Sequence, residues 1–342
     1  MKDQKKITID DVAEKAGVSK STISRYLNGK FEFMSENTRN RIEKVIEELD
    51  YRPNNTARTL KLKKSRLIGV VMADLTNPFS SILIKGIGDG CRKYNYNIII
   101  TNADNDKDRE KEYLLSLMDQ NVDGIIINGT GYNEELLIHI KNKNVPVVML
   151  DRIVNSKFFD GVTSNNYEMT FNIVNYLIDE GFHNAALFTP PVGNISSRIE
   201  RKKAFIEVCS KRLDSSNFGV YVLEDYNEGD IESKLLDFVE NHSGTKAVFA
   251  INGVVLLNVL NNMRKLKLKI PDDAGICGYD DWGWAALIPP GITTISQPSY
   301  DMGFESAKIL MEKIRRDNLG RTTCVYLKSS LKVRGSTNLK SK

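Results

Sequence analysis

Basic and hydroxyl side chains are concentrated in a short stretch near the N-terminus, residues 20–28. An exposed arginine here, Arg25, can form the paired hydrogen bonds to a guanine edge that are the commonest sequence-specific contact to DNA. Lysine and serine near the leading end of such a helix suit base edges, and threonine and serine hydroxyls suit phosphates. We predict that the following residues contact DNA: Lys20, Ser21, Thr22, Ser24, Arg25 and Asn28. The alternative is a solvated polar helix face.

Three short helices are predicted to position these residues. Thr8 and Asp11 have the spacing of a capping box for the first helix, and Gly17 ends it. Ser19 caps the second helix and Ser35 caps the third. Two helices joined by a three- to four-residue turn with glycine are typical of a helix-turn-helix, whose second helix enters the major groove.

From Leu67 onward, short β-rich runs alternate with helical stretches, a pattern that predicts a parallel sheet flanked by helices. Ligands of such sheets bind beyond the carboxyl ends of the strands. The predicted strands are Leu67–Ala73, Asn97–Asn102, Gly124–Asn128, Val147–Leu150, Gly161–Ser164, Ala185–Phe188, Gly219–Leu223, Lys246–Ile251, Gly275–Gly278 and Thr293–Gln297.

The charge of the chain is unevenly distributed. Of the net +4 over 342 residues, residues 1–64 carry +5 and the other 278 residues carry −1. A basic head on a near-neutral body fits a polyanion-binding module joined to a second domain. No run of about 20 apolar residues and no signal peptide is recognised, so we expect a cytoplasmic protein without a membrane partner.

Metal, cofactor and enzyme chemistry find no support in the sequence. The four cysteines and three histidines are scattered, without the spacing of a zinc site or a redox pair. No phosphate-binding loop and no nucleophile elbow is recognised. We therefore expect no metal, no cofactor and no enzymatic activity.

The N-terminal 61 residues resemble the lactose- and galactose-repressor family of transcription regulators. The strings that carry the resemblance are Thr8–Asn28, Ser35–Arg39, Tyr51–Asn54 and Ala57–Lys61. It implies that Ala57, Leu60 and Lys61 belong to a hinge helix that binds the minor groove, with Leu60 as the apolar wedge between base steps. The loop Phe31–Met34 departs from the family pattern because it is longer and more aromatic.

The resemblance extends through the body in the strings Leu67–Phe79, Val122–Ile126 and Gly278–Asp281. It implies an all-α helix-turn-helix head followed by an α/β, two-lobed body like a periplasmic binding protein. The lobes would be joined by three crossovers, near Ser164, Gln297 and Leu327. The implied divisions are a head at 1–52, a hinge and linker at 53–65, and a body at 66–342, with a first lobe at about 66–163 and 298–326 and a second at about 165–296 and 327–338. The short polar tail favours a homodimer over a tetramer.

The resemblance also assigns an effector cleft between the lobes. Its implied contacts are Phe79, Ser80, Asn128, Arg152, Arg201, Asn252, Asp280 and Gln297. We also predict Arg198, which lies near these positions in the sequence, and Trp282, which follows Asp280 closely, as cleft residues. Asp, Asn and Gln side chains match sugar hydroxyls, and the arginines at 152, 198 and 201 favour a sugar acid, since arginine holds a carboxylate in a forked pair. Gly253 stands where the family usually has aspartate.

The combined hypothesis is a dimeric repressor of carbohydrate or sugar-acid catabolic genes. Its operator affinity would be controlled by a small sugar or sugar acid, and 2-keto-3-deoxygluconate is one candidate. Residues 252–253, residues 281–284 and the Phe31–Met34 loop resemble the ketodeoxygluconate-repressor branch of the family. The alternatives are a sugar-binding transport receptor and an enzyme that acts on a sugar acid.

Overall fold

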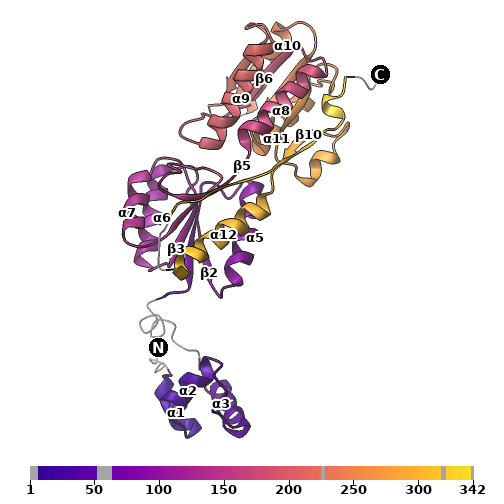
Figure 1. Ribbon diagram of the computed structural model, residues 1–342. Coiled ribbons are helices and arrows are strands. Elements are labelled where there is room, and N and C mark those ends of the chain that lie inside the picture. The colour runs from indigo at the N-terminus through magenta and orange to yellow at the C-terminus, as the bar shows by residue number, and fades with distance from the viewer. Residues whose placement is uncertain (1–6, 52–63, 225–227, 317–320, 340–342) are drawn as a thin grey trace. The chain divides into compact units, whose positions relative to one another are not determined.

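The chain divides into two units, Met1–Ser65 and Arg66–Lys342. The structure is a computed structural model and describes residues 7–51, 64–224, 228–316 and 321–339 (Figure 1). The first unit contains only helices among its described residues. The second contains two sheets with helices around them.

The head consists of α1 (Ile9–Ala16), α2 (Lys20–Leu27) and α3 (Glu36–Glu48). The predicted capping box is present: Thr8 N donates to Asp11 Oδ2 at 2.7 Å, and Asp11 N donates to Thr8 Oγ1 at 3.3 Å. Gly17 ends α1 with a φ of 61°, in the left-handed region that glycine tolerates best. Ser19 and Ser35 cap α2 and α3, so all three predicted helix starts are confirmed.

Buried apolar side chains from all three helices hold the head together. Val12 of α1, Ile23 of α2 and Ile42 of α3 are fully buried in one cluster. Ile23 lies on the opposite side of α2 from the exposed Arg25. The core therefore fixes which face of α2 is presented to a partner.

The body contains two six-stranded sheets. The first has the order β11-β5-β4-β3-β1-β2 and the second the order β12-β10-β9-β8-β6-β7. The strands of the first sheet are β1 (Leu67–Met72), β2 (Asn97–Asn102), β3 (Gly124–Asn128), β4 (Val147–Leu150), β5 (Asp160–Ser164) and β11 (Cys324–Leu327). Those of the second are β6 (Asn184–Thr189), β7 (Phe218–Val222), β8 (Lys246–Ala250), β9 (Gly275–Tyr279), β10 (Thr293–Ser296) and β12 (Ser330–Lys332).

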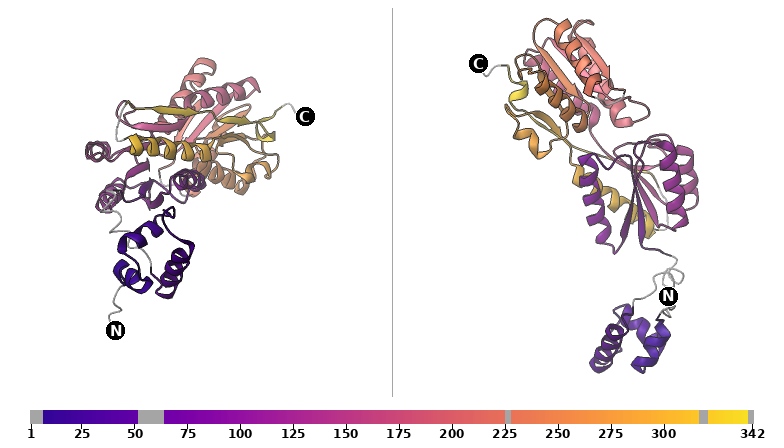
Figure 2. Two further views of the ribbon diagram at one scale, coloured as in Figure 1. Left: turned by 60° about the horizontal axis from the view of Figure 1, so that its bottom comes forward. Right: turned by 180° about the vertical axis from the view of Figure 1, so that it is seen from behind.

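Helices cover both faces of each sheet (Figure 2). In the first sheet, Val70 packs into the apolar cluster beneath α5 (Pro78–Arg92) and α12 (Ser299–Arg316). Its neighbour Val71 packs into the cluster on the other face, beneath α6 (Lys107–Asp119) and α7 (Glu134–Asn142). Successive residues of a strand point to opposite faces, so a strand covered on both sides reads as a continuous apolar run. In the second sheet, α8 (Asn166–Asp179) packs beside α9 (Ser196–Arg212), and α10 (Glu228–Asn241) beside α11 (Gly253–Lys265).

The chain passes between the sheets after Ser164, between β10 and α12, and after Leu327. Hydrogen bonds join these crossings: Ser164 Oγ donates to Gln297 Oε1 at 2.8 Å, and Ser329 N donates to Asn165 Oδ1 at 2.8 Å. The expected fold class, a helical head with a two-sheet α/β body, is confirmed.

Two strands, β11 and β12, were missing from the prediction. β11 pairs with β5 in parallel, and β12 pairs with β10 in antiparallel orientation, each at the edge of its sheet. Both are short and only partly buried. Edge strands of this kind lack the long apolar run by which the inner strands were recognised.

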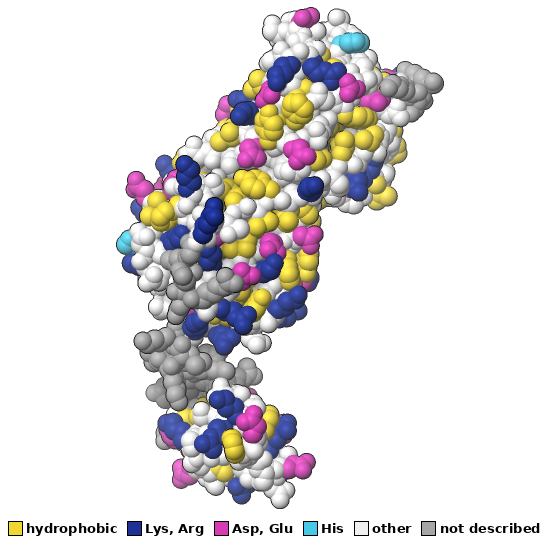
Figure 3. All heavy atoms as spheres, viewed as in Figure 1, with side chains coloured by type: hydrophobic (Ala, Val, Ile, Leu, Met, Phe, Trp, Pro, Cys, Tyr) yellow, Lys and Arg dark blue, Asp and Glu magenta, His cyan; other side chains and the backbone are white. Residues whose placement is uncertain are grey.

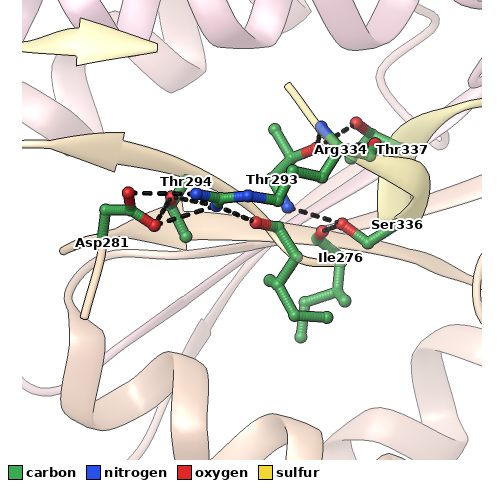
Figure 4. A network of polar contacts seen from close by, with 8 residues as sticks. Ile276, Asp281, Thr293, Thr294, Arg334, Ser336 and Thr337 are labelled. Atoms are coloured by element: carbon green, nitrogen blue, oxygen red, sulfur yellow. Dashed lines mark hydrogen bonds and ion pairs between the residues drawn. The ribbon is translucent and has the colours of Figure 1, made fainter. Parts of the chain in front are cut away.

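A network of polar contacts attaches the C-terminal segment to the second sheet (Figure 4). Arg334 Nη1 lies 2.9 Å from Asp281 Oδ1, and Arg334 Nη2 donates to Asp281 Oδ2 at 3.1 Å. Thr294 Oγ1 donates to Asp281 Oδ1 at 2.8 Å. Further along the segment, Ser336 Oγ donates to the Ile276 carbonyl oxygen at 2.6 Å.

We expect Asp281→Asn to destabilise the body by about 1–3 kcal/mol at neutral pH, because it breaks a mostly buried paired contact to Arg334. Burial raises the pKa of Asp281, but hydrogen bonds from Arg334 and Thr294 outweigh this effect and hold the pKa below its ordinary value. A carboxyl whose pKa is lower in the folded than in the unfolded state stabilises the fold above its unfolded pKa, and this contribution is lost as the pH falls through the folded pKa. The deficit of the variant should therefore shrink below about pH 4.

Urea unfolding at pH 7 and at pH 3 measures this deficit. The control is Asp179→Asn, which removes a more exposed partner of Arg212, and its deficit should stay below about 1 kcal/mol. An equal deficit for Asp281→Asn at both pH values would contradict the prediction.

Candidate functional site

The exposed face of α2 carries several of the predicted DNA contacts. Ser21, Arg25 and Asn28 are spaced four and three residues apart, so they lie along one side of the helix, and all three are exposed. The Asn28 side chain also donates to the Ser24 carbonyl oxygen at 2.6 Å at the end of the helix. Lys20 is exposed and pairs with Asp10 of α1 at 2.8 Å, a surface contact that a phosphate can replace.

Thr22 and Ser24 are partly buried in the head. Thr22 N donates to the capping Ser19 Oγ at 3.2 Å, and the Ser19 and Ser21 hydroxyls lie 2.7 Å apart. The first turn of α2 is thus held in place by its own side chains. The predicted hinge contacts Ala57, Leu60 and Lys61 lie outside the described residues.

The unusual loop after α2 is anchored at one end by aromatic contacts. The Phe31 ring meets Tyr26 edge to face at a centroid distance of 5.7 Å, and the Arg39 guanidinium lies 4.3 Å over the Phe31 ring. Phe33 points outward and is 86% exposed. Phe31 therefore belongs to the packing of the head, whereas Phe33 is presented at its surface.

A polar cleft of about 510 Å³ lies between the two sheets of the body. First-lobe residues reach it from the start of α5 and from the ends of β3 and β4, and second-lobe residues from α9 and from the ends of β8, β9 and β10. The structure brings these predicted residues together along it: Phe79, Ser80, Asn128, Arg152, Arg198, Arg201, Asn252, Asp280 and Gln297. Their position at the carboxyl ends of strands is the usual place for a ligand of such sheets.

Arg201 joins three elements at the inner wall of the cleft. It is 4% exposed, and its Nε, Nη1 and Nη2 atoms donate to Asn166 Oδ1 at 2.8 Å, the Ile251 carbonyl oxygen at 2.8 Å and Gln297 Oε1 at 3.1 Å. Its guanidinium lies 3.4 Å from the centre of the Tyr279 ring. An arginine has five N–H donors, so two remain for a ligand beyond these described contacts.

Gln297 connects this wall to a crossing between the lobes. Its Oε1 accepts from both Arg201 and Ser164, and its Nε2 donates to Asp280 Oδ1 at 2.8 Å. Asp280 Oδ2 accepts from Gly253 N at 3.0 Å. A continuous chain of hydrogen bonds therefore links the cleft to the segment that joins the lobes, and contacts made to a ligand can bias the lobe arrangement.

Two aspartates face the cleft from opposite lobes, Asp151 after β4 and Asp280 after β9. Both are buried and have positive φ, 63° and 74°. Burial raises the pKa of Asp280, against the opposing effects of Arg201, Gln297 and Gly253. Among the described residues, Asp151 Oδ1 has no hydrogen-bond partner. A ligand hydroxyl is a natural donor to such an atom, since a buried acceptor is costly to leave unpaired.

The two other cleft arginines lie nearer the surface. Arg152 Nη1 donates to the Gly129 carbonyl oxygen at 3.0 Å, and Arg198 Nη1 donates to the Pro191 carbonyl oxygen at 2.9 Å. One belongs to each lobe, so positive charge is present on both sides of the cleft. Over the visible face of the body, charges of both signs are interspersed (Figure 3).

Trp282 is not among the residues that line the cleft. It lines a second hollow of about 220 Å³ on the other side of Asp280 and Gln297, and it packs partly buried against the apolar cluster of the first lobe. A methyl group at Gly253 would lie 2.6 Å from the Trp282 ring. The indole thus takes the space that an aspartate side chain at position 253 would need, which explains the departure from the family pattern.

Sequence reasoning missed several cleft residues. They include Asp74, Asn77, Asn105, Thr130, Tyr132, Asp151 and Ser197. Asp151 directly follows β4, so the rule that directs attention to the ends of strands contained the signal for it. Tyr132 lies in a loop, and nothing in its local pattern indicates that the loop turns toward the cleft.

The described residues offer neither a metal centre nor a membrane-spanning helix. No group of three or more His, Cys, Asp and Glu side chains there is arranged to hold a metal ion. No described helix has the length and apolar character needed to cross a membrane. Burial raises the pKa of the thiols of Cys91 and Cys209 to about 12, so they are poor nucleophiles.

A helix-turn-helix head joined to a two-lobed body with a polar cleft defines a DNA-binding regulator of transcription. Residues 8–54 match the family model described as bacterial regulatory proteins, lacI family, and residues 68–318 match a periplasmic binding protein domain. The chain belongs to the LacI family of bacterial regulatory proteins.

Individual relatives agree over nearly the whole chain. The chain is 39% identical over 330 residues to the HTH-type transcriptional regulator KdgR of Bacillus subtilis (strain 168), with 96% of this chain and 97% of that protein covered. A LacI family transcriptional regulator from Enterococcus faecium, solved with bound ribose, is 29% identical at a TM-score of 0.69, over 80% of this chain and 100% of that one. The lac repressor dimer bound to operator and the anti-inducer ONPF has the same fold, with a TM-score of 0.83 at 24% identity over 97% and 99% of the two chains.

Family membership settles the broad expectations. The resemblance to the repressor family and the expected role in DNA-binding transcription regulation are confirmed. The family consists of DNA-binding regulators and not of enzymes, which agrees with the expectation of no enzymatic activity. Regulators of this kind act on DNA in the cytoplasm, as expected from the sequence. The similarity to KdgR agrees with the branch suggested by the sequence.

Proposed function

We propose that this regulator is a dimeric repressor of carbohydrate or sugar-acid catabolic genes, controlled by a small sugar acid in the interlobe cleft. The observation that carries the proposal is the combination of buried acceptors and arginines in one cleft. Asp151 and Asp280 match sugar hydroxyls, and Arg152, Arg198 and Arg201 match a carboxylate. The sequence resemblance to the ketodeoxygluconate-repressor branch, with which the similarity to KdgR agrees, makes 2-keto-3-deoxygluconate the first effector to test.

The proposed DNA contacts in the head are those on α2 and at its end. Arg25, Lys20 and Ser21 are proposed to read base edges, and Thr22 and Ser24 to contact phosphates. The hinge residues Ala57, Leu60 and Lys61 are proposed to bind the minor groove. A dimer is proposed because the lac repressor, which shares the fold, binds its operator as a dimer. Two-fold symmetric regulators of this kind bind near-palindromic sites.

The proposed division of the chain follows the same logic. Residues 1–52 form the head, 53–65 the hinge and linker, and 66–342 the body that binds the effector and dimerises. Within the body, the first lobe takes about 66–163 and 298–326 and the second about 165–296 and 327–338. The effector changes operator affinity because it binds one arrangement of the lobes better than the other.

We expect 2-keto-3-deoxygluconate to raise the melting temperature of the full-length protein by about 5 °C or more at saturating concentration, since a ligand that binds only the folded state stabilises it. Glucose serves as the neutral control and should have a smaller effect, because it has no carboxylate for the arginines. A thermal-shift screen of sugar acids and neutral sugars compares the two effects on the melting temperature. Operator binding is then measured in the presence of each ligand that raises it. If only neutral sugars shift the melting temperature, the sugar-acid assignment is wrong.

DNA binding has a separate test. The full-length protein should select a near-palindromic site from a library of random DNA duplexes. Failure to retain any duplex would contradict the proposed operator binding.

A further inference from the structure

Two loops meet across the cleft at a distance from the crossings that join the lobes. Residues 129–133 follow β3 of the first lobe, and residues 190–195 follow β6 of the second. In the second sheet, β8 and β9 separate β6 from β10, the strand that leads into a crossing. A ligand in the cleft therefore lies between the crossings on one side and these two loops on the other.

The two loops approach each other closely at Gly131 and Gly193. A methyl group at Gly131 would lie 2.9 Å from the Asn194 carbonyl oxygen, and one at Gly193 would lie 3.1 Å from Tyr132 Oη. We call these four residues, Gly131, Tyr132, Gly193 and Asn194, the mouth contact. Beside it, Ile153 N of the first lobe donates to Ser196 Oγ of the second at 2.8 Å.

The first-lobe loop is held rigidly by a buried carboxylate. Glu110 is 1% exposed, and its Oε2 accepts from Thr130 N at 2.5 Å while its Oε1 accepts from Thr130 Oγ1 at 3.0 Å and Asn133 Nδ2 at 2.9 Å. Arg152 holds the Gly129 carbonyl oxygen from the other side. A loop fixed in this way cannot swing aside to admit a larger side chain or ligand at low cost.

The second-lobe loop is held at its start by two hydrogen bonds. Thr189 Oγ1 donates to the Pro190 carbonyl oxygen at 2.8 Å, and Arg198 donates to the Pro191 carbonyl oxygen. The two loops in contact narrow the cleft on this side, so a ligand that extends past them must push the lobes apart. A single sugar-acid unit fits within about 510 Å³, the size of a small-molecule pocket.

We propose that the mouth contact limits the effector to a single sugar-acid unit, and that Gly131 and Gly193 are the residues that set this limit. This inference rests on the proposed function, which supplies the sugar acid. A side chain at position 131 prevents the loops from meeting. The small ligand then loses the enclosed state, in which both lobes contact it at once, while a longer ligand loses little because it already requires an open mouth.

The test is calorimetric titration of the full-length protein with 2-keto-3-deoxygluconate and with lactobionate, a disaccharide acid. We expect Gly131→Ala to weaken the binding of 2-keto-3-deoxygluconate by about tenfold or more, and so to lower the preference for the smaller acid by about the same factor. Tyr132→Ala should reduce the preference in the same direction. Tyr132 is 55% exposed, so its removal does not depend on the core of the body.

The matched control is Gly181→Ala. Gly181 has a φ of 99°, comparable to the 89° of Gly131, but a methyl group there would meet only the Leu339 side chain at 3.9 Å. It thus imposes left-handed backbone strain without closing a gap, and it should leave the preference unchanged. The size limit would be overturned if Gly131→Ala left the preference for 2-keto-3-deoxygluconate over lactobionate unchanged. It would also be overturned if Gly181→Ala changed this preference as much as Gly131→Ala does. Wild-type protein that binds neither acid would overturn the proposed function itself.

Discussion

Arg25→Ala is expected to weaken operator binding by about 1–3 kcal/mol per half-site, because it removes a paired hydrogen bond to a base edge. Arg25 is exposed on α2, away from the core residues Val12, Ile23 and Ile42, so the head should remain folded. Binding to unrelated DNA should fall much less, since that binding depends on charge rather than on base edges. Fluorescence anisotropy with the selected operator and a scrambled duplex, at two salt concentrations, measures both quantities.

A charge-matched control separates base reading from simple attraction. Lys44→Ala removes one positive charge from an exposed position on α3. It should weaken the binding of both duplexes by a similar, small factor. If Arg25→Ala also weakens the binding of the two duplexes equally, Arg25 contributes only charge. The assignment of α2 as the base-reading helix then fails.

The helical head was predictable in detail because its signals are local. Thr8, Ser19 and Ser35 each cap a helix through a hydroxyl that accepts from a backbone N–H three residues on, and Gly17 supplies the left-handed residue that ends α1. Such contacts join residues close in sequence, so residue types and spacing are sufficient to predict them. Arg25 is on the exposed side because Ile23 must be on the buried side.

The cleft was predictable only in part because its contacts are made across long distances in the sequence. The ends of buried strands could be located, and the residues that follow them do line the cleft. The direction of Trp282 could not be inferred, since it depends on the space above Gly253 and on an apolar cluster of the other lobe. The approach of Gly131 to Asn194 likewise joins two loops of unremarkable composition.

Arg201→Ala is expected to abolish the response of operator binding to the effector while leaving binding without effector within a few-fold of wild type. The substitution removes the donor that ties Asn166, Ile251 and Gln297 together, and it removes the N–H groups that remain for a carboxylate. Loss of one such bond to a buried partner costs about 1–3 kcal/mol, so circular dichroism melts are needed to choose a temperature at which the variant stays folded.

Two further variants make the result specific to the cleft. Arg201→Lys keeps the positive charge, so this variant should stay folded better than Arg201→Ala. It lacks the planar fork that reaches three acceptors, so its operator binding should respond only weakly to the effector. Arg212→Ala, on the same helix α9, removes contacts to Asn175 and Asp179 outside the cleft and should respond like wild type. Operator binding titrated against the effector distinguishes the three. An unchanged response in Arg201→Ala would contradict the proposed role of Arg201 in holding the effector at this wall.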